Sequence, residues 1–92
     1  MMTATKTSRQ AAANCDRFEA LIVGSTFTTY ACTRSKGGAI ISLRCVERYT
    51  KIDQDTVQAS DGRQWSFACC GASGASVAIV PDGSYSALPY FV

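Results

Sequence analysis

The stretch that decides the fold is "TVQASDGRQWSF", residues 56–67, in which two short runs of strand-forming residues flank an Asp-Gly pair. A two-residue turn at this pair would set the apolar positions of the two runs on opposite faces of a hairpin. A three-residue loop over residues 60–62, with Gly62 in a left-handed conformation, instead pairs Val57 with Trp65. This register places one apolar set on a single face, which we expect to be core: Val57, Ala59, Trp65, Phe67 and Cys69.

A second hairpin is predicted upstream, where the sequence again alternates with period two. The segments 25–35 and 39–49 are rich in Thr, Ile and aromatic residues, and a Gly-Gly pair lies between them. If this pair forms the turn, Tyr30 pairs with Cys45 and the inward residues of both strands fall on one side. The alternation assigns Ile41, Leu43 and Cys45 to the inward face and Ser42, Arg44 and Arg48 to the outward face.

The segment before these strands, "SRQAAANCDRFEALIVG", is predicted to form a helix over residues 9–20. Ser8 is a candidate N-cap, and Gly24 is a natural stop. Residues 21–23 stay open between helix and strand, because all three are apolar and two are β-branched. The helix face expected to be buried carries Ala11, Cys15, Phe18 and Ile22.

The C-terminal part is predicted to form a third hairpin. A strand over residues 77–80 leads into the turn 81–83, where Pro presets the first turn position and Gly supplies a positive φ. Residues 84–92 would then return as a further strand. The predicted fold class is therefore α+β, with an N-terminal helix and five or six antiparallel strands that curl strongly or close into a small β-barrel.

Length and composition indicate a single domain over residues 1–92, with residues 1–7 as a flexible tail. The formal charge of +2 is too small to imply nucleic-acid binding by itself. The N-terminus lacks the apolar core of a signal peptide, and no run approaches the roughly 20 apolar residues that cross a bilayer. We therefore expect a soluble, cytoplasmic protein that has no membrane contact.

The chain has no histidine, which removes Ser-His-Asp and Cys-His nucleophiles, His general bases and His metal ligands. Its cysteines do not have the spacing of a zinc site, since the close pair, Cys69 and Cys70, would point to opposite faces of a strand. In a reducing compartment we expect them to be small buried side chains, with a reactive thiol at Cys70 as the alternative. The five cysteines are Cys15, Cys32, Cys45, Cys69 and Cys70. No catalytic residue, metal site or cofactor is predicted.

Basic side chains on the outward face and at the hairpin tips are candidate binding residues. They could form one patch suited to a phosphate backbone or to an acidic protein surface. An ordinary solvated face is the plainer interpretation, because Glu47, Asp53 and Asp55 lie close in sequence. The apolar segment 84–92 must pack on its own core, on a second copy or on a partner. The candidate partner-binding residues are Arg34, Lys36, Arg44, Arg48, Arg63, Tyr85 and Tyr90.

The stretch "CVERYTKIDQDTVQASDGRQWSF", residues 45–67, resembles a pattern found in small SH3-like barrel proteins of bacteriophages, in which a Thr-Lys stretch, a β-branched strand and Asp-Gly-Arg precede an aromatic strand. The resemblance implies a phage accessory protein, such as an anti-CRISPR or other anti-defence inhibitor. The expected function is therefore non-enzymatic: the protein docks on a host defence complex and blocks it sterically. Two alternatives stay open, a nucleic-acid-binding barrel and a structural phage protein that self-associates, with a homodimer through the apolar C-terminal segment.

Overall fold

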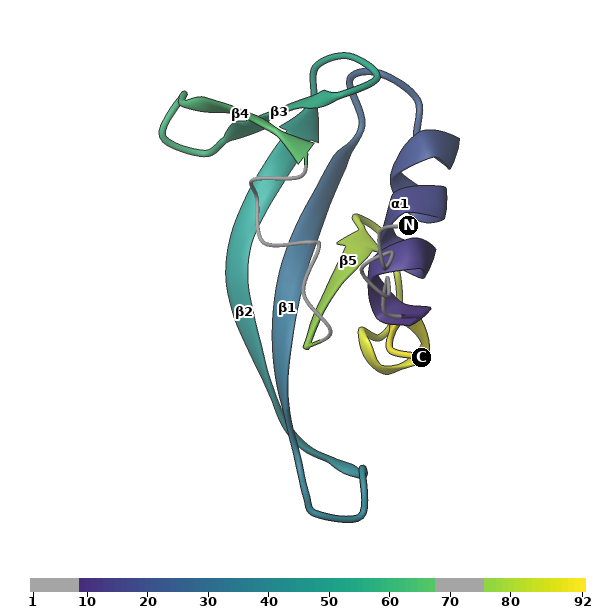
Figure 1. Cartoon of the computed structure of the whole chain (residues 1–92). Helices are drawn as coiled ribbons and strands as arrows, with labels where there is room; N and C mark the ends of the chain where they lie inside the picture. Colours follow the sequence, from purple (N-terminus) through teal and green to yellow (C-terminus); the bar gives the residue numbers. More distant parts are fainter. Residues whose placement is uncertain (1–8, 68–75) are drawn as a thin grey trace, which may run out of the picture.

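The computed structural model describes residues 9–67 and 76–92, which form one α-helix, a five-stranded sheet and a short 3₁₀ helix near the C-terminus. The helix lies beside one edge of the sheet, and the two longest strands form a hairpin that extends past it (Figure 1). In chain order the elements are α1 (Arg9–Ala20), β1 (Thr26–Arg34), β2 (Ile40–Lys51), β3 (Thr56–Ala59), β4 (Gln64–Ser66), β5 (Val77–Pro81) and η2 (Leu88–Tyr90).

The strands are antiparallel and follow the order β4-β3-β2-β1-β5. The first four strands form a meander, and β5 returns to pair with β1 on the other side. Among the described strands β4 and β5 lie at opposite edges and do not pair with each other. The predicted α+β class with an antiparallel sheet is therefore confirmed, whereas the sheet is open and neither closes into a barrel nor curls strongly (Figure 1).

The turn between β3 and β4 has the predicted three-residue geometry. The Ala59 N–H donates to the Arg63 carbonyl oxygen at 2.8 Å, and Gly62 has a φ of 91°. Val57 pairs with Trp65, as the register argument requires. The turn residues thus determine the register locally, and the resulting pairing carries Val57 into the core.

Trp65, however, is not a core residue, and this part of the prediction is wrong. It is 41% exposed, because it lies on the short edge strand β4. The helix contacts this hairpin two residues later, at Phe67. The Phe67 ring stacks on the ring of Phe18 in α1, with centroids 4.1 Å apart. Phe67 and Ala59 pack against the core as predicted, and Cys69 lies outside the described residues.

The β1–β2 hairpin has the predicted pairing of Tyr30 with Cys45, but its apolar face does not join the core. A β-bulge interrupts the ladder between Thr29 and Tyr30. Thr29 is buried on the core side, so by strand alternation Tyr30 and its partner Cys45 point to the other face. The predicted inward face of the second strand is therefore wrong, because its three residues are exposed: Ile41, Leu43 and Cys45.

The helix begins and ends where predicted, and residues 21–23 form no strand. Its buried face is rotated from the predicted one, because Cys15 is exposed and Ile22 is 78% exposed. The C-terminal end of the helix is closed by Lys51, a buried side chain whose Nζ donates to the carbonyl oxygens of Phe18 and Leu21 at 2.7 and 2.8 Å. The observed buried residues of the helix are Gln10, Ala11, Asn14 and Phe18.

Two side-chain amides explain this rotation, since they bind main-chain groups of other segments. The Asn14 Nδ2 donates to the Val77 carbonyl oxygen at 2.7 Å, and its Oδ1 accepts from the Ile79 N–H at 3.2 Å. One helical turn earlier, Gln10 uses its amide in the same way on the C-terminal segment, with the Tyr90 carbonyl oxygen at 2.9 Å. The helix is therefore attached to the free edge of β5 by groups that replace a neighbouring strand.

This attachment also overturns part of the third predicted hairpin. The turn is present, with Gly83 at a φ of 92° and the Ser84 N–H donating to the Pro81 carbonyl oxygen at 3.2 Å. Residues 84–92 form no strand and instead contain η2. The edge of β5 that a returning strand would need is already occupied by Asn14, so the chain crosses to the helix instead.

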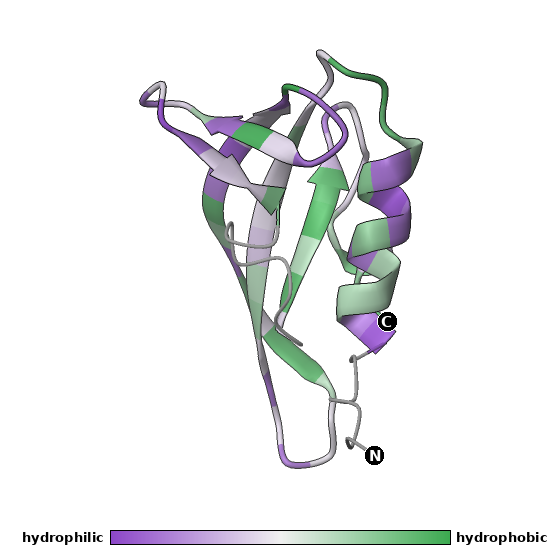
Figure 2. Cartoon of the chain, turned by 45° about the horizontal axis from the view of Figure 1, so that its top comes forward, coloured by the Kyte–Doolittle hydropathy of each residue, from purple (hydrophilic) through white to green (hydrophobic). Residues whose placement is uncertain are grey.

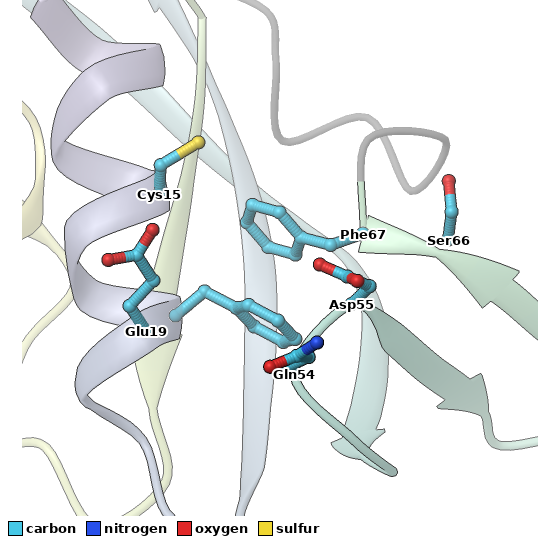
Figure 3. Close-up of a pocket in the computed structure, with 7 residues that line it drawn as sticks. Cys15, Glu19, Gln54, Asp55, Ser66 and Phe67 are labelled. Carbon is cyan, nitrogen blue, oxygen red and sulfur yellow. The ribbon is translucent and has the colours of Figure 1, made fainter.

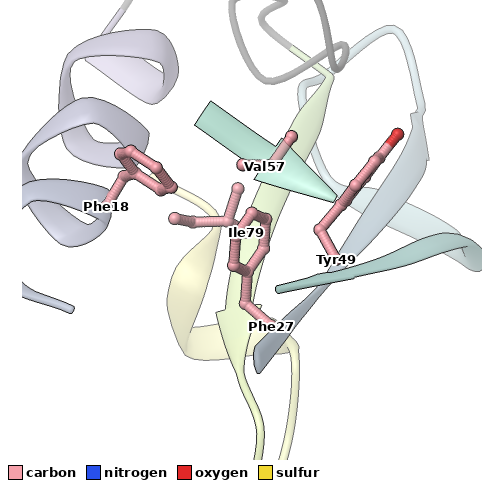
Figure 4. Close-up of a cluster of buried hydrophobic side chains, with 5 residues drawn as sticks. All are labelled: Phe18, Phe27, Tyr49, Val57 and Ile79. Atoms are coloured by element: carbon pink, nitrogen blue, oxygen red, sulfur yellow. The ribbon is translucent and has the colours of Figure 1, made fainter. Parts of the chain in front are cut away.

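The core lies between α1 and the sheet, where β1, β2, β3 and β5 each contribute a side chain that packs with Phe18 of the helix (Figure 4). The predicted burial of the cysteines is wrong for the described ones: Cys15 and Cys45 are exposed, and Cys32 is half-buried. Cys15 follows the buried Asn14 by one position, and Cys45 lies on a part of the hairpin that no other described element covers. Cys69 and Cys70 are outside the described residues. The buried cluster consists of Phe18, Phe27, Tyr49, Val57 and Ile79.

Candidate interaction surface

The far end of the β1–β2 hairpin, residues 33–46, projects beyond the rest of the sheet; we call it the arm (Figure 1). On one side, β5 pairs with β1 only over residues 27–31. On the other side, β3 pairs with β2 only over residues 49–51. Within the described part of the chain, every residue of the arm except Ile40 is consequently exposed.

The arm carries apolar side chains although no other described element covers it. Ile41 is 65% exposed, Val46 is 46% exposed and Leu43 is 37% exposed. Figure 2 shows a hydrophobic stretch of the hairpin just above its turn. Cross-strand pairing gathers four residues on the face that points away from the core, which we call the apolar strip: Tyr30, Cys32, Leu43 and Cys45.

Three of the predicted partner-binding residues lie on the arm, which contains no acidic residue. The Arg34 guanidinium donates to the Gly38 carbonyl oxygen at 2.8 Å and to the Val92 carbonyl oxygen at 3.2 Å, so it holds the turn and the C-terminal segment. Lys36 and Arg44 have no ion-pair partner among residues 9–67 and 76–92. The arm is therefore a basic and partly apolar surface.

The structure separates Arg48 from this group. Its guanidinium forms an ion pair with Asp82 at 2.6 Å, which connects β2 to the turn after β5. Asp82 also accepts a hydrogen bond from the Thr26 hydroxyl. The Thr26 hydroxyl, and after it the Arg48 guanidinium, hold the pKa of the Asp82 carboxyl below its ordinary value, because both stabilise the charged form. The charge of Arg48 is largely matched within the fold.

Arg63 lies elsewhere, at the tip of the β3–β4 hairpin, which is at the opposite end of the molecule from the β1–β2 turn (Figure 1). Its Nε is 3.3 Å from the Asp61 carboxylate of the same turn. The basic residues that the sequence grouped as one patch are thus divided between the arm, the β5 turn and the β3–β4 tip.

The two tyrosines differ in their surroundings. Tyr85 is fully exposed, whereas Tyr90 is half-buried and anchors the C-terminal segment on the helix. The Arg17 guanidinium lies 5.0 Å from the centre of the Tyr90 ring, and the Tyr90 hydroxyl is 2.9 Å from the Ser84 hydroxyl. The structure therefore brings Tyr85 to the surface and uses Tyr90 in packing.

A hollow of about 300 Å³ lies between α1 and the β3–β4 hairpin (Figure 3). Phe67 stacks on Phe18 in this hollow, and Cys15, Glu19 and Asp55 also line it, with Asp55 on the side opposite the helix. Across the described ranges no three metal-ligating side chains come together. The hollow offers apolar and acidic contacts.

Sequence reasoning missed the open edge of β2, and it missed the hollow. The hollow joins residues from the helix, the β2–β3 connection and β4, so no local pattern could indicate it. The open edge did leave a signal. The alternating segment 39–49 is much longer than the segment 56–59 that pairs with it, and the excess length has to project.

In the parts of the chain that the structure describes, no helix has both the length and the apolar character needed to cross a bilayer. Comparison of the chain with protein families, with curated proteins and with solved structures finds no match, so the function has to be inferred from the arm and its surroundings.

Proposed function

We propose that this chain is a non-enzymatic binding protein that docks on a protein partner through the arm. The observation that carries the proposal is the combination of exposed Ile41, Leu43 and Val46 with Lys36 and Arg44 on one projecting hairpin. Neither basic side chain forms an ion pair with any residue of the described ranges. Exposed apolar side chains with basic groups on the same element are typical of a protein interface.

The more specific form of the proposal is a phage or mobile-element inhibitor that blocks a host defence complex of the CRISPR type. The resemblance of residues 45–67 to small phage proteins supports it. Steric blocking requires only a surface that fits the target, and the arm offers a projecting one because β5 and β3 pair with its strands only outside residues 33–46. In this form the protein acts in the host cytoplasm.

The alternative functions have less support. A nucleic-acid interface would collect its basic groups on one surface, yet Arg48 and Arg63 are paired with carboxylates away from the arm. A homodimer through the C-terminal segment would need its apolar residues free, yet Tyr90 packs under Arg17 and the Val92 N–H donates to Gln10 at 2.9 Å. Tyr85 and Leu88 remain exposed there and are the residues that such a dimer would use.

The proposal is tested by affinity capture from bacterial lysate and from purified CRISPR-type complexes. The double variant Leu43→Glu, Arg44→Glu should lose the captured protein, because it reverses both features of the arm. Arg63→Glu is the matched control, since it reverses a charge at an exposed tip away from the arm and should retain the capture.

The captured protein is then purified and its binding measured directly with the wild type and both variants. Partner binding that is insensitive to the arm variant would overturn the proposed surface. Catalytic turnover by the purified chain, or no affinity for any defence complex, would overturn the proposed inhibitor. Binding to single-stranded oligonucleotides that weakens steeply with salt would support the nucleic-acid alternative instead.

A further inference from the structure

The free edges of β5 and β2 differ in what binds their main-chain groups. The edge of β5 is occupied, because Asn14 binds both a carbonyl oxygen and an N–H of that strand. The edge of β2 over residues 40–48 has no neighbouring strand within the described residues. An uncovered edge of this length is a template for pairing with another extended chain.

The hydrogen-bond pattern shows which main-chain groups face this edge. The Cys32 N–H donates to the Ser76 carbonyl oxygen at 2.9 Å, so the main chain of Cys32 is directed toward β5. In an antiparallel ladder the direction alternates, so Thr33 and its partner Ser42 are directed toward each other, as are Ala31 and its partner Arg44. The intervening residues of β2, Leu43 and Cys45, therefore direct their N–H and carbonyl groups outward.

We propose that β2 binds an extended segment of the partner by strand addition at Leu43 and Cys45, and that this segment alternates apolar and acidic residues. The inference rests on the proposed function, because it specifies how the arm would hold its partner. Main-chain hydrogen bonds to the outward groups supply affinity that does not depend on side chains, and the alternating side chains supply specificity.

The alternation follows from the two faces of β2. On one face, Leu43 and Cys45 belong to the apolar strip, so a strand added beside them places its apolar side chains there. On the other face, Arg44 is exposed and has no ion-pair partner in the described residues. With three basic residues and no acidic residue on the arm, the side chains of the added strand that face Arg44 should be acidic.

A second copy of this chain fits the same edge less well. Two β2 strands related by a two-fold axis through the middle of the free segment would place Arg44 opposite Arg44, and like charges directly opposite are unfavourable. The two arms would also bring together six basic residues, and the acidic residue of the free edge, Glu47, already accepts hydrogen bonds from Ser60. Charge thus favours an acidic partner over a homodimer.

The test uses a synthetic nine-residue peptide that alternates Val and Glu, added at about 1 mM to the full chain. Hydrogen exchange measured by NMR should slow by about tenfold or more at the amides of Leu43 and Cys45. The amides of Ser42 and Arg44 already lie in the ladder with β1 and should change little. The same peptide with Lys in place of Glu should bind about tenfold more weakly or not at all.

A pair of variants separates strand addition from contact with the side chains alone. Leu43→Pro removes an outward N–H and should abolish protection at the edge, and proline is tolerated on an edge strand whose N–H faces away from the ladder. Leu43→Ala removes a comparable apolar side chain but keeps the N–H, so it should weaken peptide binding by less than about threefold. Circular dichroism of both variants checks that the sheet is intact.

Equal weakening by the two variants would overturn strand addition while leaving docking on the arm in place. No protection by the Val-Glu peptide, or equal binding of the Lys peptide, would overturn the proposed chemistry of the partner. Protection of Leu43 and Cys45 that grows with protein concentration without peptide, with a dimer in sedimentation equilibrium, would identify a second copy as the occupant and would also overturn it.

Discussion

Replacing Asn14 with Ala tests the contact that attaches the helix to the sheet edge. Asn14 is fully buried, and its amide binds the Val77 carbonyl oxygen, the Ile79 N–H and the Gln10 amide at 2.7, 3.2 and 3.2 Å. Alanine is the better helix former, so a loss of stability would come from the contacts of the Asn14 side chain and not from helix propensity.

The size of the loss follows from the groups left behind. Two main-chain groups of β5 lose their partner, and each unsatisfied buried group costs about 1–3 kcal/mol. We expect Asn14→Ala to lower the free energy of unfolding by about 3 kcal/mol in total. A domain of this length is stable by roughly 5–14 kcal/mol, and each kcal/mol corresponds to roughly 4–8 °C. The melting temperature should therefore fall by roughly 12–24 °C.

Urea unfolding followed by circular dichroism measures this loss. Glu19→Ala is the matched control, because Glu19 is an exposed residue of the same helix, and its cost should stay within about 0.5 kcal/mol. Hydrogen exchange at Ile79 gives a local readout, since its N–H loses its acceptor in the variant. A cost for Asn14→Ala below about 1 kcal/mol would show that water or a rearranged helix replaces the amide.

Asn14→Asp adds a test that depends on pH. The carboxylate can accept from the Ile79 N–H but repels the Val77 carbonyl oxygen, whereas the protonated acid can donate to it. Burial and this repulsion raise the pKa of the new carboxyl in the folded state. Its stabilising contribution is then complete below the unfolded pKa of about 3.9 and is lost as the pH rises through the folded pKa. A deficit relative to the wild type that does not change with pH would contradict the proposed contact.

Three further predictions concern single side chains. Asp82→Asn should destabilise the protein at pH 7, and the difference from the wild type should shrink as the pH falls below about 4. The reason is that the lowered pKa of the Asp82 carboxyl gives stability that is present above the ordinary pKa of the group and is lost on acidification. Urea unfolding at both pH values measures this difference, and a difference that stays constant would argue against the pairing with Arg48. Lys51→Met should lower the free energy of unfolding by about 1–3 kcal/mol in the same assay, since two carbonyl oxygens at the end of α1 lose their donor. An unchanged midpoint of urea unfolding would mean that the cost of burying the Lys51 charge cancels the gain from its hydrogen bonds. Gly62→Ala should lower the free energy of unfolding by about 1 kcal/mol because Gly62 has a φ of 91°. Gly37→Ala is the control, since Gly37 has no positive φ, and it should change this free energy little. Equal effects of the two substitutions would contradict the left-handed turn.

The candidate surface was predictable only in part. Alternation in the sequence placed Arg44 on a strand face and Lys36 at a hairpin turn, and the structure brings them together with Arg34 on the arm. It did not show that Arg48 has a partner in Asp82, because the two residues are 34 positions apart and meet only when β5 has paired with β1. Whether these residues bind a partner stays a prediction.

Local chemistry in the sequence was sufficient for the helix bounds, for the β3–β4 register and for the middle of the β1–β2 hairpin, whereas irregularities after Thr29 and Thr33 shift the β1–β2 register on either side. The three-residue turn ending at Gly62 and the pairing of Tyr30 with Cys45 depend on residues close in the chain, so tertiary contacts were not needed to infer them. Which face of each element is buried depends instead on what covers it. Tertiary structure alone decided that Asn14 faces the sheet edge while Cys15 is exposed, and that the C-terminal segment crosses to the helix. The physical reason is competition for one strand edge, because the amide of Asn14 satisfies the main chain of β5 and excludes a sixth strand there. Among the described strands, none takes the edge of β2 beyond its short pairing with β3.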